Sequence, residues 1–207
     1  MSTPLTWGTP HPERADAARN RQLLLTTARA LIAADGPDCL TMDRLAERSG
    51  LGKGTVFRRF GTRAGIFQAL LDDNERALQQ EILSGAPPLG PGAPPVDRLV
   101  AYGSARIHFL AENHEIARSA IDGRPTNGRR PPLSQIHIRV LLRELDPPGA
   151  DVDLLAGQLT SALEGPLLSQ LFDGPELGQA ELDRSELTAR FEAGWRYLVE
   201  RVCTLAA

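Results

Sequence analysis

Residues 41–60 of the chain read TMDRLAERSGLGKGTVFRRF, two short segments with helical spacing of apolar residues on either side of a glycine-containing turn. Thr41 is suited to cap the first segment as a helix, because its hydroxyl oxygen can accept a hydrogen bond from a free backbone N–H. Gly50 can adopt the left-handed conformation that ends this helix. A second helix is expected from Lys53 to Phe60, so the spacing predicts a helix-turn-helix unit.

Basic residues are concentrated around this unit, although the whole chain carries a net charge of -3. Up to Ala69 the sequence holds ten Lys or Arg against six Asp or Glu, whereas the remainder holds 13 against 20. From Arg48 to Leu71 there are five basic residues and no acidic one. The net charge argues against a wholly basic coat protein, but this segment can dock on a polyanion such as double-stranded DNA.

The second helix is the one expected to enter a major groove, while the first braces it across the DNA backbone. Lys53, Gly54 and Thr55 occupy its groove-facing start, and Arg58, Arg59 and Arg63 are placed to reach flanking phosphates. The alternative is a helical hairpin whose basic face is simply solvated. A phosphate-binding loop is excluded, because that motif requires Ser or Thr directly after its Lys.

The quoted stretch resembles the DNA-binding domain of the TetR family of repressors, and the resemblance covers about Arg19 to Leu70. It implies a homodimer that binds a palindromic DNA operator and is released from it by a small-molecule effector. It also implies that Thr41 bonds a phosphate and that Lys53 meets a phosphate or a base. In the same comparison Gly54 and Thr55 face base edges, and Arg63 clamps the DNA backbone.

Two positions depart from the usual pattern of that family. Gly52 stands where the family often has Ser, and Phe57 stands where it often has Tyr. Both changes remove a hydroxyl that commonly bonds a phosphate. Arg58 and Arg59 are expected to compensate, because each can add a charge-assisted contact to a phosphate.

An all-α fold of about nine helices is expected, because helical periodicity recurs throughout and no segment alternates apolar and polar residues. Of the eleven residues between Ser84 and Val96, five are Pro and three are Gly, which marks the clearest boundary. A separate short helix is expected from His114 to Ala120. The predicted organisation is an N-terminal tail (1–15), a three-helix DNA-binding domain (16–62), a connecting helix (63–83), a Pro/Gly-rich loop (84–95) and a helical ligand-binding and dimerisation domain (96–207).

Within the last domain, residues of mixed aromatic and cationic character are candidates for lining a small-molecule pocket, although ordinary packing explains them equally well. These candidates are Tyr102, Arg106, Phe109 and Phe172. The final two helices carry rows of apolar residues, with small residues among them, and are predicted to form a four-helix bundle with a second copy. The predicted interface residues are Leu155, Leu159, Ala162, Leu163, Phe191, Trp195 and Leu198.

Other classes of protein are less consistent with the sequence. No catalytic motif or cofactor fingerprint is evident, so neither an enzyme nor a cofactor is predicted. His108, Glu112 and His114 can be imagined as metal ligands, but an exposed helix edge is the preferred interpretation and no metal is expected. No apolar run is long enough to span a membrane, and a cytoplasmic location is predicted. A helical enzyme with an incidental basic hairpin and a DNA-packaging or adaptor protein without a ligand remain the alternatives.

Overall fold

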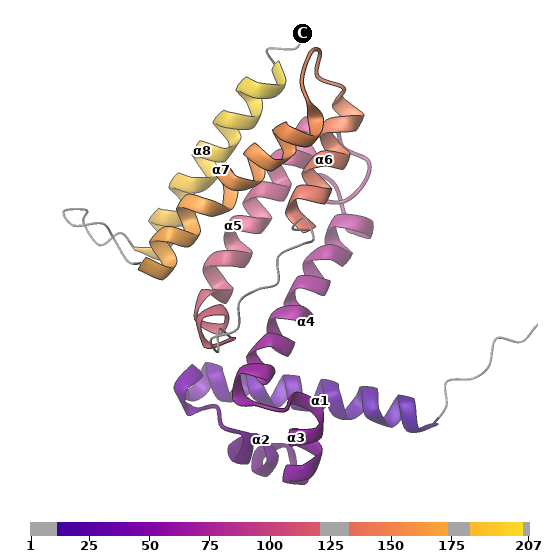
Figure 1. Cartoon of the computed structure of the whole chain (residues 1–207), viewed down its shortest axis with the longest axis vertical. Coiled ribbons are helices and arrows are strands. Elements are labelled where there is room, and N and C mark those ends of the chain that lie inside the picture. The colour runs from indigo at the N-terminus through magenta and orange to yellow at the C-terminus, as the bar shows by residue number, and fades with distance from the viewer. Residues whose placement is uncertain (1–11, 121–132, 174–182, 205–207) are drawn as a thin grey trace, which may run out of the picture. The chain divides into compact units, whose positions relative to one another are not determined.

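The computed structural model describes residues 12–120, 133–173 and 183–204, and within these ranges the chain is helical with short connections (Figure 1). The elements are α1 (Pro12–Asp35), the 3-10 helix η1 (Pro37–Cys39), α2 (Met42–Ser49), α3 (Lys53–Phe60), α4 (Arg63–Ser84), α5 (Pro95–Ala120), α6 (Leu133–Leu145), α7 (Val152–Asp173) and α8 (Arg184–Thr204). Two compact units divide within α4. The first domain comprises the described residues up to Leu71 and residues 119–120, and the second domain comprises the other described residues.

The first domain is held together by apolar side chains from all of its helices. The fully buried members have 0% exposure and are Leu24, Leu25 and Ala28 of α1, Leu40, Leu45 of α2, Val56 of α3, and Ile66, Phe67 and Leu70 of α4. Because α2 and α3 are only eight residues long, they are too short to be stable alone and depend on this shared core. The core therefore fixes the angle between the two short helices.

The second domain has its own core, formed by residues of α4 to α8. α6 and α7 pack closely against each other, and α7 and α8 lie side by side (Figure 1). α7 continues through Pro166, which has no N–H to offer the carbonyl of Ala162. Within the described ranges, no helix is long and apolar enough to cross a membrane.

Two boundaries differ from the sequence expectation. α1 begins at Pro12, inside the predicted tail. The separate helix predicted from His114 is wrong: α5 is continuous, because no Gly or Pro lies between Gly103 and Ala120 and Asn113 is accommodated by hydrogen bonds with Phe109 and Asn74. The described residues therefore form eight α-helices and one 3-10 helix, and the ninth element is the turn at η1 rather than a helix after His114.

Candidate nucleic-acid interface

Local sequence determines where each helix of the helix-turn-helix begins and ends. Thr41 Oγ1 accepts a hydrogen bond from the backbone N–H of Arg44 at 3.1 Å and so caps α2. Gly50 ends α2 with a φ of 68°, a conformation that costs little only for a residue without Cβ. Thr62 Oγ1 accepts from the N–H of Gly65 at 3.0 Å and caps α4. The structure thus confirms the predicted cap at Thr41 and the predicted turn at Gly50.

α3 presents one face to the core and the other to solvent. Val56 is fully buried, whereas Phe57 is 52% exposed and Arg58 and Arg59 are exposed. Gly54 is also exposed, and a Cβ atom placed on it would meet no atom within 4 Å. The start of α3 therefore has an open surface on which a DNA base pair can approach the backbone closely.

Lys53 at the start of α3 already has an anionic partner. Its Nζ lies 2.9 Å from Asp43 Oδ1 of α2, and both side chains are about two-thirds exposed. Such an exposed ion pair contributes only about 0–1 kcal/mol to stability, so a DNA phosphate can compete with Asp43 for the ammonium group of Lys53. Sequence analysis missed Asp43, because the acid-free segment was counted along the chain whereas this carboxylate arrives from the neighbouring helix.

Arg59 and Arg63 are engaged inside the domain. Arg59 donates to the carbonyl of Ala17 in α1 at 3.0 Å. Arg63 donates from Nε to the carbonyl of Leu40 and from a terminal nitrogen to the carbonyl of Pro37, both at 2.8 Å. Its guanidinium also lies over the ring of Phe67. Arg63 therefore ties α4 to the turn before α2, whereas its predicted contact with a DNA phosphate remains a prediction.

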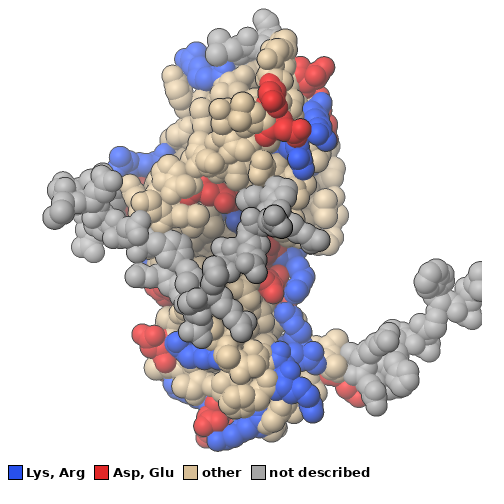
Figure 2. Space-filling model, in the orientation of Figure 1, with Lys and Arg blue, Asp and Glu red and all other residues tan. Residues whose placement is uncertain are grey.

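Arg58 differs from both, because its side chain is exposed and no hydrogen bond or ion pair engages it within the described residues. Figure 2 shows Lys and Arg side chains gathered along one side of the part of the surface that belongs to the first domain. The first domain thus combines an exposed helix start with accessible cations, which is the chemistry that a duplex backbone requires.

The two arginines should respond differently to removal. Arg63→Ala is expected to lower the free energy of unfolding by about 1–2 kcal/mol, because two backbone carbonyls lose a charged donor that is partly exposed. Arg58→Ala is expected to leave stability within about 0.5 kcal/mol of the parent. It should instead reduce the log–log salt dependence of duplex binding by about 0.9. Urea denaturation and salt titrations measure the two effects, and an unchanged stability of Arg63→Ala would contradict the tether.

Comparison with known proteins assigns this domain. Residues 24–70, which include α2, α3 and the start of α4, match the model of the bacterial regulatory proteins of the tetR family. The first domain is thus similar to the DNA-binding domain of the TetR family. An HTH-type transcriptional regulator of Staphylococcus aureus is 39% identical over 62 residues, which are 29% of this chain and 32% of that protein. The match thus spans about a third of the length of this curated relative.

Solved structures of similar fold cover residues of both domains. A TetR/AcrR-family transcriptional regulator from Thermobifida fusca has a TM-score of 0.59 at 18% identity, covering 86% of this chain and 97% of that one. A protein from Mesorhizobium loti assigned to the same family has a TM-score of 0.59 at 20% identity, covering 90% and 97%. The match of residues 24–70 agrees with the DNA-binding domain that the sequence predicted.

The predicted ligand residues occupy different surroundings in the second domain. Arg106 is paired at 2.8 Å with both Glu164 and Glu75, and its guanidinium lies over the ring of Phe109. Burial alone would lower the pKa of Arg106. The combined attraction of the two carboxylates has the larger effect, so the pKa of Arg106 is raised. Arg106 therefore links α4, α5 and α7 as an internal cation. The side chain of Phe172 lies outside the described residues.

Tyr102 is the predicted ligand residue that lies beside a cavity. It is 3% exposed, and burial raises its pKa to about 12, so the phenol stays protonated. Its ring is 4.7 Å from that of His137 in α6. Both residues line a hollow between α4, α5 and α6. Sequence analysis missed His137 and the cavity, because residues from three separate helices create it.

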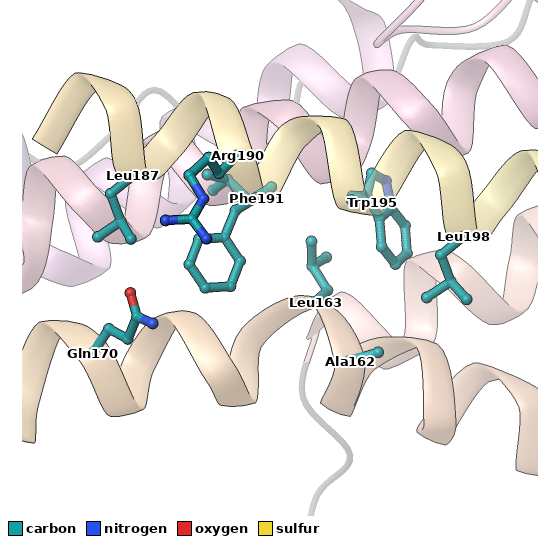
Figure 3. Close-up of a pocket in the computed structure, with 10 residues that line it drawn as sticks. Ala162, Leu163, Gln170, Leu187, Arg190, Phe191, Trp195 and Leu198 are labelled. Carbon is teal, nitrogen blue, oxygen red and sulfur yellow. The ribbon is translucent and has the colours of Figure 1, made fainter. Parts of the chain in front are cut away.

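The predicted interface residues of α7 and α8 divide into two groups (Figure 3). Leu159, Leu163 and Trp195 are only 2–4% exposed and belong to the core of a single chain. Trp195 Nε1 donates to the carbonyl of Leu99 at 2.9 Å. The other predicted residues retain surface: Leu155, Phe191 and Leu198 are partly buried, and Ala162 is exposed. Of the predicted interface residues, only this second group therefore has surface available for contact with a second copy.

The histidines once considered as metal ligands have other neighbours. His108 Nε2 is 3.2 Å from Glu192 of α8, and His114 Nδ1 is 2.9 Å from the carbonyl of Ala111. Among the residues that the structure describes, no three His, Cys, Asp or Glu side chains come together as a metal site.

Proposed function

We propose that this chain is a repressor of the TetR family that binds a palindromic operator as a homodimer and is released by a small molecule. The observation that carries the proposal is the exposed start of α3, where Gly54 leaves the backbone uncovered beside Lys53 and Arg58. A major groove admits such a helix, and exposed cations on its flank neutralise phosphates. The DNA-contacting residues proposed are Thr41, Lys53, Gly54, Thr55, Phe57, Arg58 and Arg59.

Dimerisation follows from the requirements of sequence-specific binding. One helix-turn-helix unit reads only a few base pairs, and two units held about one helical turn apart read a palindrome. The surface of α7 and α8 supports a second copy, because Ala162 and Gly194 lie exposed beside the partly buried Phe191 and Leu198. Small residues allow the helices of two subunits to approach closely, so a four-helix bundle is the proposed interface.

Sedimentation tests both parts of this proposal. The full-length protein is expected to be a dimer at micromolar concentration and to bind one palindromic duplex, selected from a random pool, as two subunits per duplex. Ala162→Arg should shift the protein towards monomer, because it places an unpaired charge in an apolar contact. It should also weaken operator binding by more than about tenfold.

Ala150→Arg is the matched control, since it introduces the same side chain at an exposed position just before α7. This variant should remain dimeric and bind the operator as the parent does. A parent protein that is monomeric and binds its preferred duplex as a monomer would contradict the homodimer.

A further inference from the structure

A cavity of about 300 Å³ lies within the second domain, between α4, α5 and α6. Its lining is largely apolar. Four of the eight large apolar side chains that are exposed in the described part of the chain line it, namely Leu83, Leu133, Ile136 and Val140. A cluster of exposed apolar side chains around one cavity indicates a binding site, whereas single exposed apolar residues scattered over a surface do not.

Two polar atoms of this lining lack a partner. Arg98 Nε and His137 Nε2 are both buried, and neither forms a hydrogen bond within the described residues. Buried nitrogen atoms in native proteins nearly always have a hydrogen-bond partner, so an unsatisfied pair on the wall of one cavity calls for an explanation. An oxygen atom of a bound molecule supplies what both nitrogen atoms require.

The ionised groups around the cavity are already matched. Arg98 lies 3.5 Å from Glu144, and Glu75 lies 2.8 Å from Arg106. Burial, together with the nearby Arg98 charge, lowers the pKa of His137 to about 4, so its imidazole is neutral at pH 7. A charged ligand would have to leave water and compete with these ion pairs for a counter-ion, which is unfavourable.

We propose that this cavity binds an uncharged, mainly apolar molecule through a carbonyl oxygen that accepts hydrogen bonds from Arg98 Nε and His137 Nε2. The inference rests on the proposed release by a small molecule, and it names the chemical class of that effector. The neutral imidazole donates as its Nε2–H tautomer. The apolar side chains at the mouth contact the remainder of the molecule and provide most of the affinity.

Calorimetry with the full-length protein tests whether the cavity prefers an uncharged molecule. Three probes of similar shape are compared: 4-tert-butylacetophenone, 4-tert-butylbenzoate and 4-tert-butylbenzylamine. The ketone is expected to bind at least about tenfold more tightly than the anion or the cation. Equal or tighter binding of either charged probe would overturn the proposal, and so would undetectable binding of the ketone at millimolar concentration.

Variants test the location. His137→Phe retains an aromatic ring without its nitrogen atoms, and Arg98→Met retains an apolar stem, so each should weaken ketone binding about tenfold. His108→Phe is the matched control on an exposed position of α5 and should bind the ketone as the parent does. Circular dichroism establishes that each variant is folded. Unchanged ketone affinity in both cavity variants would place the probe elsewhere and overturn the assignment.

A separate experiment tests whether the cavity has a role in regulation. The ketone is added to the protein bound to its operator, and release of the DNA is measured. Tight binding to the free protein without any release of DNA would support the chemistry of the cavity and contradict the proposed release. Release by the ketone that persists in His137→Phe and Arg98→Met would support a small-molecule effector and contradict this cavity as its site.

Discussion

Gly54→Glu is expected to reduce operator binding by at least about 100-fold while the protein stays folded. A carboxylate at this exposed position of α3 would stand in the groove, where it meets the negative potential of two phosphate backbones and blocks close approach of the helix. Stability should change by less than about 1 kcal/mol, because the new side chain extends into open space and Glu favours a helix more than Gly does. Fluorescence anisotropy with a labelled operator and thermal denaturation measure the two quantities.

Ala33→Glu is the matched control, because it adds the same charge to the first domain on an exposed position of α1. Only a few-fold loss of affinity is expected there, through long-range repulsion that added salt screens. If Gly54→Glu bound the operator as the parent does, α3 would not be the helix that enters the groove.

Gly103→Ala is expected to lower the free energy of unfolding by about 2–3 kcal/mol. Gly103 of α5 is buried directly against the indole of Trp195, and a Cβ atom there would overlap Nε1 and Cδ1 of that ring. The indole would have to move, and its hydrogen bond to the carbonyl of Leu99 would be strained or lost. The usual preference of Ala over Gly in a helix is about 1 kcal/mol, too small to offset this overlap.

Gly194→Ala tests whether the effect is specific. It adds the same methyl group to the interior of α8, where a Cβ atom would meet nothing within 4 Å. This variant should be as stable as the parent or more stable by up to about 1 kcal/mol. Urea denaturation followed by circular dichroism compares the two, and equal stabilities would contradict the close packing of Trp195 on α5.

The features that were predicted best from the sequence depend only on residues that are close together along the chain. The cap at Thr41 and the left-handed turn at Gly50 each follow from the conformational preferences of a few residues, and the structure confirms both. The Pro- and Gly-rich stretch before Pro95 likewise interrupts the helices as expected. Helical periodicity then identified the all-α class, because it requires only the spacing of apolar residues along each segment.

Features that join distant residues could not be read in the same way. Arg63 is read from the sequence as a free cation, yet its partners are carbonyl groups more than twenty residues earlier. Arg106 looked suitable for a ligand, but its charge is taken by Glu75 and Glu164 from two other helices. Leu159 and Leu163 were assigned to a partner surface from an apolar row, whereas the row alone does not tell which side packs within its own chain. Tertiary contacts decide all three cases.

Among the described residues, Trp195 is the one tryptophan, and this makes it an optical label for the second domain. Trp7, the other tryptophan of the chain, lies outside the described residues and can be replaced by Phe. The remaining emission then comes from an indole that is 4% exposed and bonded to the Leu99 carbonyl. Its wavelength reports whether α5 and α8 are packed, while unfolding of α1, α2 and α3 leaves it unchanged. Fluorescence can thus follow unfolding of the second domain while circular dichroism follows the helices of both domains in the same sample.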